Sequence, residues 1–348
     1  MSDGARSASG GASRSEIEEL RASVAALREQ LDLRFGTQRP VPEPGASLRA
    51  APAEGMLERL RRGLRRVDGL DLVELYDGFR RRASAVERTE ISNRIDEFGL
   101  DVAYLERLRG LLDFLYDRWW RVRTVGIEDV PDDGPVLFVA NRSGVLPYDG
   151  LMIAHALERE RPTGHRPRFL IADWLATLPF SQSRLARVGG VRACQENAER
   201  LLASGHRVVV FPEGQKGALK PFHDRYRLQR FGRGGFVSLA VRQRAVLVPV
   251  AVVGAEEVHP VLYQPPLSRQ LLGVPLTVTP TFPLLGPLGL VPLPSQWRIR
   301  FGEAVRFDDV APERADDPLY VNRTRERVRS TIQHLLETEV RQRRSVWR

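Results

Sequence analysis

The sequence predicts an α/β fold, a mixed sheet flanked by helices and preceded by an α-helical N-terminal region. Three observations support this fold class. From Gly126 onward, short apolar runs alternate with stretches of helical length, a pattern typical of strands covered by helices on both faces. Before that point, from Met56 to Arg123, the chain is rich in arginine and has helical character. With 348 residues it is long enough for one large α/β domain with appendages.

Composition limits the classes of function. The single cysteine, Cys194, excludes an internal disulfide framework, and no apolar run approaches the length of a membrane span. No signal peptide is visible at the N-terminus, so we expect a cytoplasmic protein. The net charge of +9 favours anionic partners such as lipid surfaces or phosphorylated substrates. Aromatic residues do not interleave with a basic stripe, so a nucleic-acid partner is not expected.

The first 55 residues divide into three predicted segments. Residues 1–14 are expected to form a disordered tail, because they consist mostly of small and polar residues. Residues 15–35 are predicted to form a helix, opened by a capping box of Ser15 and Glu18 and carrying a short seam of apolar residues that allows a coiled coil. Residues 36–55 are predicted to be a linker rich in proline and glycine.

Residues 56–120 are predicted to form a helical region. It ends in Leu111-Leu112-Asp113-Phe114-Leu115-Tyr116-Asp117-Arg118-Trp119-Trp120. This amphipathic segment with an aromatic and basic end allows two interpretations. It could lie at a membrane interface, or it could pack against the main domain.

Residues 121–345 are predicted to form the α/β domain. The predicted strands are 135–140, 168–172, 207–211, 245–253, 276–279 and 297–301, with a further strand near 188; the predicted helices lie near 150–160, 195–204, 234–243 and 321–344. Ligands in such folds bind at the carboxyl ends of strands, so the residues that follow each strand are the candidates for chemistry.

Four segments with a distinctive composition stand at the ends of these predicted strands. They are Asn141-Arg142-Ser143-Gly144-Val145-Leu146-Pro147-Tyr148-Asp149-Gly150, Val188-Gly189-Gly190-Val191-Arg192, Phe211-Pro212-Glu213-Gly214-Gln215-Lys216-Gly217 and Val248-Pro249-Val250. Taken in this order, they resemble the motifs of the phospholipid/glycerol acyltransferase family, which includes the glycerol-3-phosphate and lysophosphatidate acyltransferases. The resemblance covers about residues 115 to 305 and implies a glycerolipid acyltransferase-like fold.

The resemblance also implies roles for individual residues. In the family's first motif a histidine removes the proton of the acceptor hydroxyl and an aspartate orients it; Asp149 takes the place of the aspartate. The second motif implies that Arg192 binds the acceptor phosphate, and the third that Glu213 and Gly214 shape the phosphate site. The expected catalytic residues are Asp149 and Arg142, and the expected substrate-binding residues are Asn141, Ser143, Arg192, Glu213, Gly214, Lys216 and Gly217. Glycines on both sides of Lys216 let the backbone approach a phosphate closely.

The sequence departs from the family pattern at one decisive place, because Arg142 stands where the family carries its histidine. Deprotonating a guanidinium at pH 7 costs about 7–9 kcal/mol, more than the roughly 3–5 kcal/mol that a general base contributes. Arg142 is therefore not the base. It can pair with Asp149, hold a phosphate or stabilise an oxyanion. Among the six histidines, only His223 and His259 are predicted to lie near the strand ends.

Two functions follow from these features. The first is an acyltransferase that moves a fatty acyl group from an acyl-CoA or acyl-carrier-protein thioester to a lyso-lipid or glycerol-phosphate acceptor, in phospholipid synthesis or remodelling. The second is a pseudoenzyme that keeps the lipid or acyl-thioester pocket but has lost turnover with the histidine. In either case we expect peripheral attachment to the inner face of the cell membrane, co-substrates rather than a bound cofactor, and no metal.

Overall fold

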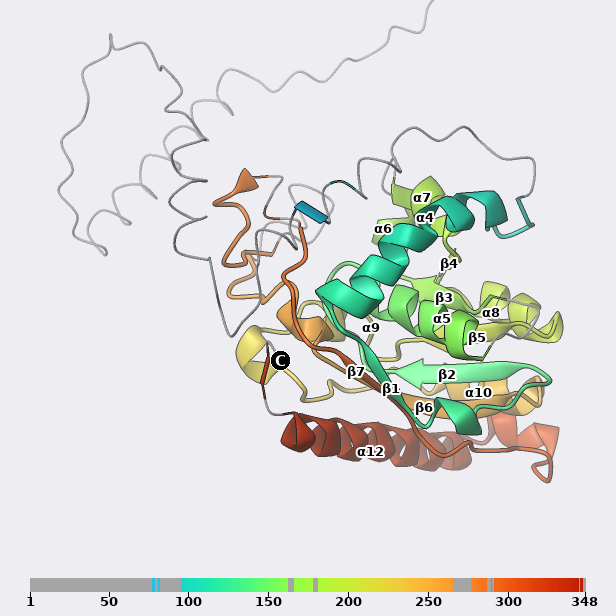
Figure 1. Ribbon diagram of the computed structural model, residues 1–348. Helices are drawn as coiled ribbons and strands as arrows, with labels where there is room; N and C mark the ends of the chain where they lie inside the picture. The colour runs from blue at the N-terminus through green and yellow to red at the C-terminus, as the bar shows by residue number, and fades with distance from the viewer. Residues whose placement is uncertain are drawn as a thin grey trace, which may run out of the picture. The chain divides into compact units, whose positions relative to one another are not determined.

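The computed structural model describes residues 77, 78, 81, 95–161, 166–177, 181–265, 277–286, 289, 291–343, 345 and 346 (Figure 1). Several predicted segments lie outside the described residues: the tail at 1–14, the helix at 15–35 and the linker at 36–55. Of the predicted helical region at 56–120, the part before residue 95 is described only at residues 77, 78 and 81.

The centre of the domain is a mixed seven-stranded sheet, which confirms the predicted fold class. Its strands are β1 (Arg123–Val125), β2 (Val136–Ala140), β3 (Arg168–Ile171), β4 (Gly190–Arg192), β5 (Arg207–Val210), β6 (Val246–Val253) and β7 (Arg298–Phe301), in the spatial order β1-β7-β6-β2-β5-β3-β4. Strands β6, β2, β5, β3 and β4 are parallel to one another. Strand β7 is antiparallel to β6, and β1 pairs in parallel with β7, so these two strands run in the opposite direction. The carboxyl ends of the five parallel strands therefore meet at one edge of the sheet.

Helices cover both faces of this sheet. They are α4 (Val102–Phe114), a π-helical turn (Leu115–Trp119), α5 (Tyr148–Glu160), α6 (Asp173–Thr177), α7 (Ser181–Arg187), α8 (Gln195–Ala203), α9 (Gly214–Ala218), α10 (Gly235–Arg242) and α12 (Pro318–Gln342), with short 3₁₀ turns at Ile127–Asp129, Phe222–Asp224, Ala255–Glu257 and Pro312–Asp316. Figure 1 shows α4 and α5 on one side of the sheet and α10 and α12 on the other.

The two faces bury separate hydrophobic cores, and β2 shows why. Its five residues are all buried, and they alternate: Val136, Phe138 and Ala140 join the core under α4 and α5, while Leu137 and Val139 join the core under α8, α10 and α12. This period of two is the geometry of a strand. Because both faces are covered, the central strands consist of continuous apolar residues rather than alternating ones.

The helical segment before the sheet packs into the first of these cores. The Asp101 carboxylate accepts a hydrogen bond from the Tyr104 amide at 3.0 Å and caps α4. Trp119 and Trp120 are buried, and the Trp120 ring stacks on Trp297 with 4.6 Å between ring centroids. Of the two interpretations of the segment ending at Trp120, packing against the domain is therefore confirmed. Its tryptophans contact the protein core and cannot serve a membrane interface.

Three local expectations are corrected by the structure. The chain is already a strand at Arg123–Val125, where a helix was predicted up to Arg123; parallel pairing with β7 overrides the local preference. The predicted strand at 276–279 does not join the sheet: in its described part, Val278 makes one isolated bridge, to Tyr263. The short helices α6, α7 and α9 were not predicted, because each is seven residues or fewer and too short to show a period.

Candidate active site

Asn141 follows β2, and its side-chain amide connects β2 to β6 by hydrogen bonds. The Asn141 amide nitrogen donates to the Val252 carbonyl at 3.0 Å, and its carbonyl oxygen accepts from the Val252 amide at 2.7 Å. Asn141 is fully buried. The structure therefore gives Asn141 a positioning role, in which it fixes the end of β2 against β6.

The next residue, Arg142, forms a buried ion pair with Asp149. The Arg142 Nη1 donates to Asp149 Oδ1 at 2.8 Å, and Asp149 is fully buried in the first turn of α5. The backbone amides of Ser143 and Gly150 also donate to the Asp149 carboxylate, each at 2.8 Å. Burial raises the pKa of Asp149, while the guanidinium and the amides oppose that rise. The predicted pairing of Arg142 with Asp149 is thus seen directly.

The Arg142 guanidinium is held on its other sides as well. Its Nη2 donates to the Val145 carbonyl at 3.2 Å, and its Cζ lies 5.0 Å from the centroid of the Phe211 ring. Arg142 also lines the adjoining cavity, where a ligand could meet it. A fixed, permanently charged donor in a buried place is suited to stabilising an oxyanion.

Glu213 connects the strand-end segments to one another. Its carboxylate accepts from the Arg142 amide at 2.8 Å and from the Gln229 amide at 2.7 Å. Burial raises the pKa of Glu213. The positive charge of the Lys220 ammonium, 3.9 Å away, opposes this rise. Glu213 therefore positions the loop that carries Arg142 and is buried away from solvent.

Two glycines make this close packing possible. Gly214, the first residue of α9, adopts a left-handed φ of +57°, which allows the helix to begin with only three residues between it and the end of β5. At Gly217 a Cβ atom would lie 2.6 Å from the Glu213 Cβ and 2.9 Å from the Arg142 Cβ. Gly217 therefore lets α9 pack against the loop that follows β2, whereas Lys216 on the same turn is exposed.

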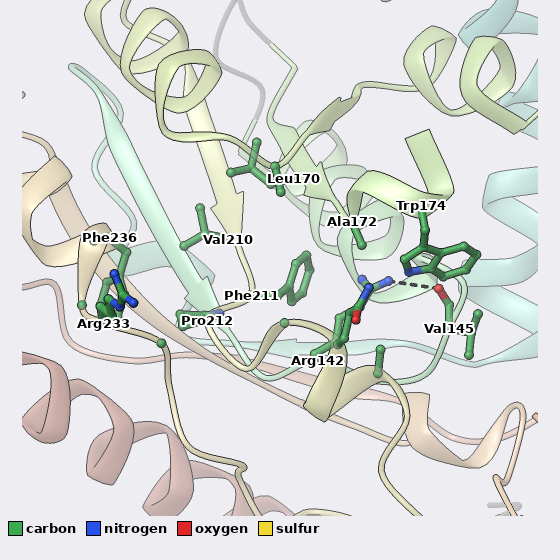
Figure 2. A pocket seen from close by; sticks show the side chains of 17 residues that line it. Arg142, Val145, Leu170, Ala172, Trp174, Val210, Phe211, Pro212, Arg233 and Phe236 are labelled. Carbon is green, nitrogen blue, oxygen red and sulfur yellow. Dashed lines mark hydrogen bonds between the residues drawn. The ribbon is translucent and has the colours of Figure 1, made fainter. Parts of the chain in front are cut away.

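A cavity of about 230 Å³ opens beside Arg142 at the carboxyl ends of β3 and β5. Its walls are mainly apolar and include Val145, Leu170, Trp174, Val210, Phe211 and Phe236. Figure 2 shows Arg142 beside Phe211 and Trp174, and Arg233 beside Phe236 on the other side of the cavity. An apolar space between two guanidinium groups can take a molecule with an apolar part and an anionic part.

The structure brings some of the predicted site residues together and leaves others apart. Arg142, Asp149, Ser143, Glu213 and Gly217 form one connected, buried cluster. Arg192 lies at the end of the outermost strand, β4, where its exposed side chain pairs with Asp173 at 2.9 Å. It does not line the cavity, although its neighbour Ala193 does.

Sequence reasoning did not select Arg233, Trp174 and Phe236, which line the cavity. A signal existed for Arg233, which stands in a basic, glycine-rich run immediately before α10. For Trp174 the sequence signal is its position shortly after β3. Phe236 has no distinguishing signal, because apolar residues of this kind are expected on the buried face of any amphipathic helix.

Neither histidine that was predicted to lie near the site replaces the missing one. The His223 side chain is 79 % exposed and lies 3.4 Å from Asp224. His259 is half-buried, with its ring 6.0 Å from the Tyr148 ring. The side-chain and amide groups that donate to Asp149 belong to Arg142, Ser143 and Gly150, so the carboxylate orients a guanidinium rather than an imidazole.

Comparison with known proteins identifies the family of this chain. A family model described as Acyltransferase matches residues 121–253. The chain belongs to the phospholipid/glycerol acyltransferase family. Uncharacterized proteins of Mycobacterium tuberculosis and Mycobacterium bovis are each 47 % identical over 255 residues, which is 73 % of this chain and 71 % of theirs. An uncharacterized protein of Mycobacterium leprae is also 47 % identical, over 73 % of this chain and 70 % of its own.

Among solved structures, the chain is similar to the 1-acyl-sn-glycerophosphate (LPA) acyltransferase PlsC from Thermotoga maritima. The two are 16 % identical, with a TM-score of 0.45, over 78 % of this chain and 97 % of the other.

Proposed function

We propose that the protein transfers a fatty acyl group from an acyl-CoA or acyl-carrier-protein thioester to a glycerophospholipid-type acceptor. The observation that carries this proposal is the position of the buried Arg142–Asp149 pair at the edge of an apolar cavity of about 230 Å³. Family membership supports the same reaction class. The cavity walls suit the acyl chain, and the guanidinium suits the charge that develops on the thioester oxygen.

In this reaction the acceptor oxygen attacks the thioester carbonyl. A carbon–oxygen bond forms, the carbon–sulfur bond breaks, and the departing thiolate takes the proton that the hydroxyl gives up. Arg142 would stabilise the tetrahedral oxyanion, while Asp149 and the Val145 carbonyl hold its guanidinium in place. Arg142 accepts no proton, so this arrangement lowers the barrier by electrostatics alone.

One observation favours the second candidate, a binding protein without turnover. The hydrogen bonds that Asp149 accepts come from a guanidinium and two backbone amides, so the pair of groups that deprotonates the acceptor in the family is not assembled here. An assay of thiol release with a panel of acyl-CoA donors and lyso-lipid acceptors separates the two functions. Turnover with any donor and acceptor supports the enzyme; binding of acyl-CoA without turnover across the panel supports the binding protein.

We further propose that Arg192 contacts the acceptor phosphate. Replacing Arg192 by alanine should raise the KM for phosphorylated acceptors by about 10- to 100-fold, because a hydrogen bond to a charged group contributes roughly 1.5–3 kcal/mol. The KM for neutral acceptors should not change. Arg200→Ala is a matched control, because Arg200 is an exposed arginine that pairs with Glu97, and neither residue lines the cavity beside Arg142. Equal losses with both kinds of acceptor would count against this role of Arg192.

We also propose that the protein attaches peripherally to the inner face of the cell membrane, where a lyso-lipid acceptor would lie. Among the described residues no helix has both the length and the apolar character needed to cross a bilayer. The exposed side chains of Leu262, Tyr263 and Leu284 can enter a lipid surface, and the net charge of +9 favours anionic lipid.

Liposome flotation checks this attachment. The protein should float with vesicles that contain anionic lipid and dissociate as salt is raised, because screening weakens charge interactions beyond about 10 Å at 0.1 M salt. Flotation that is independent of lipid charge would remove the electrostatic part of the proposal, and no flotation would remove the attachment itself.

A further inference from the structure

A second and larger cavity, of about 550 Å³, lies at the opposite edge of the sheet from Arg142 and Asp149. Arg168, the first residue of β3, and His206, just before β5, both line it, so it sits at the amino ends of these strands. The remaining lining comes from α4, from the residues before α4, from the second half of α5, and from Arg166, just before β3. The proposed acyl-transfer chemistry uses none of these residues.

Two buried arginines dominate the polar lining. The side chains of Arg166 and Arg168 are only 4 % and 3 % exposed. The Nη1 of Arg166 bonds to Glu158, and the Nη2 of Arg168 bonds to Asp96. The other four guanidinium nitrogens, Nε and Nη2 of Arg166 and Nε and Nη1 of Arg168, are buried and have no hydrogen-bond partner among the described residues.

Such a group of unpaired donors is unusual in a folded protein. A buried polar group without a partner destabilises the fold, and the penalty is larger when the group is charged. Four of them on two neighbouring side chains therefore point to a partner that carries several acceptor oxygens. A phosphate group matches this need, because its oxygens accept paired hydrogen bonds from guanidinium groups.

The distribution of charge with depth supports an anionic ligand. The cavity also carries the carboxylates of Asp96, Glu97, Glu106 and Glu158 and the guanidinium of Arg109. The side chains of Asp96, Glu158 and Glu97 are 34 %, 36 % and 55 % exposed, and Glu106 is exposed as well. The carboxylates are thus partly solvated, whereas Arg166 and Arg168 are not. Burial, together with the positive charges of Arg168 and Arg109, lowers the pKa of Arg166 to about 10, so an anion placed there would relieve the repulsion among these cations.

The lining also offers groups for the organic part of a ligand. Leu100, Leu105 and Leu112 contribute apolar surface. His155 bonds to Asp113 through Nε2 at 3.1 Å, and its buried Nδ1 has no hydrogen-bond partner in the part of the chain that the structure describes. Burial lowers the pKa of His155 to about 4, so the ring is neutral at pH 7. With Nε2–H donated to the carboxylate, Nδ1 is an acceptor and suits a hydroxyl group.

We propose that this cavity binds a phosphorylated organic molecule, with its phosphate on Arg166 and Arg168 and its apolar body against Leu105 and Leu112. The site is separate from the proposed acyltransferase site, and its occupancy does not depend on that function.

Isothermal titration of the full chain with phenyl phosphate, and separately with inorganic phosphate, tests the site. Phenyl phosphate should bind more tightly than inorganic phosphate, because the cavity is far larger than a phosphate group and partly apolar. Arg166→Gln and Arg168→Gln should each weaken binding about tenfold or more, since each removes charge-assisted hydrogen bonds. Arg192→Gln is the control at the proposed acceptor site and should leave this binding unchanged.

Other outcomes overturn the proposal. If only Arg192→Gln loses binding, the phosphate binds at the proposed acceptor site and not in this cavity. If phenyl phosphate and inorganic phosphate bind with equal affinity, the cavity does not recognise the organic part of the ligand. Because a buried arginine variant can fail to fold, crystals of the unsubstituted protein with tungstate, an electron-dense phosphate substitute, give a second test. Tungstate between Arg166 and Arg168 is expected; tungstate only elsewhere, or none, would contradict the site.

Discussion

Replacing Arg142 by alanine should reduce acyl transfer by about 100- to 1000-fold, the loss expected when one donor to a developing oxyanion is removed. The variant also leaves the fully buried Asp149 carboxylate without its cation, so it should lose about 3–5 kcal/mol of stability. Rates must therefore be expressed per folded molecule, from thiol release measured well below the variant's melting temperature. Asp149→Asn is the matched variant, because it removes the charge and keeps the shape.

Arg142→His separates the two candidate functions. If wild type is an enzyme that uses the guanidinium, Arg142→Ala should remove activity that is already present. If wild type is a binding protein, it should be inactive, and Arg142→His should create measurable transfer, because Asp149 is in place to orient an imidazole. An active wild type whose rate is the same in both variants would show that residues 141–149 do not perform the chemistry.

Replacing Lys220 by methionine should destabilise the fold by about 3–5 kcal/mol at pH 8, where Glu256 is ionised, because it leaves buried carboxylates without their cation. The Lys220 ammonium is 2 % exposed and donates to Glu256 at 3.0 Å, with Glu213 at 3.9 Å. Chemical denaturation measures the loss. Adding Glu256→Gln to Lys220→Met should restore part of it, since one of the unpaired charges is then gone. A loss below about 1 kcal/mol, the range of solvated surface pairs, would contradict a buried pair.

Glu256 alone should make stability depend on pH. Burial raises the pKa of Glu256 from 4.5 to about 7, although Lys220 opposes the rise. The folded protein therefore holds a proton on Glu256 between about pH 4.5 and 7 that the unfolded chain has released, and stability falls as pH rises through that window. Wild type should thus lose about 2–3 kcal/mol relative to Glu256→Gln between pH 4.5 and 8, measured by denaturant unfolding. A difference that does not change with pH would contradict the raised pKa.

The parts of the fold that the sequence predicts are those whose signal is local. Val136–Ala140 and Val246–Val253 are apolar runs that contain several valines; such runs favour strands, and in this fold both of their faces are buried. The end of β2 was predictable for the same reason, and with it the place of Arg142 and Asp149 at the edge of the sheet.

The parts that sequence did not predict depend on partners far along the chain. Trp120 becomes a core residue by stacking on Trp297, and the three-residue strand β1 exists only because β7 pairs with it. Lys220, which precedes Glu256 by 36 residues, was visible as one of two lysines beside the third motif, but its burial was not. The cavity beside Arg142 is lined from five separate parts of the chain, and no local pattern marks such a set.

Arginine at position 142 has a consequence for how the protein tolerates acid. A histidine in that place gains a proton near pH 6.5, so an enzyme that needs its neutral ring slows as the surroundings acidify. Arginine side chains are not deprotonated in proteins, and the guanidinium at this position is held between Asp149 and the Val145 carbonyl. Residue 142 therefore adds no acidic limb to a pH–rate profile. Protonation of a histidine at this position, which would reduce turnover in mildly acidic surroundings, does not occur in this protein.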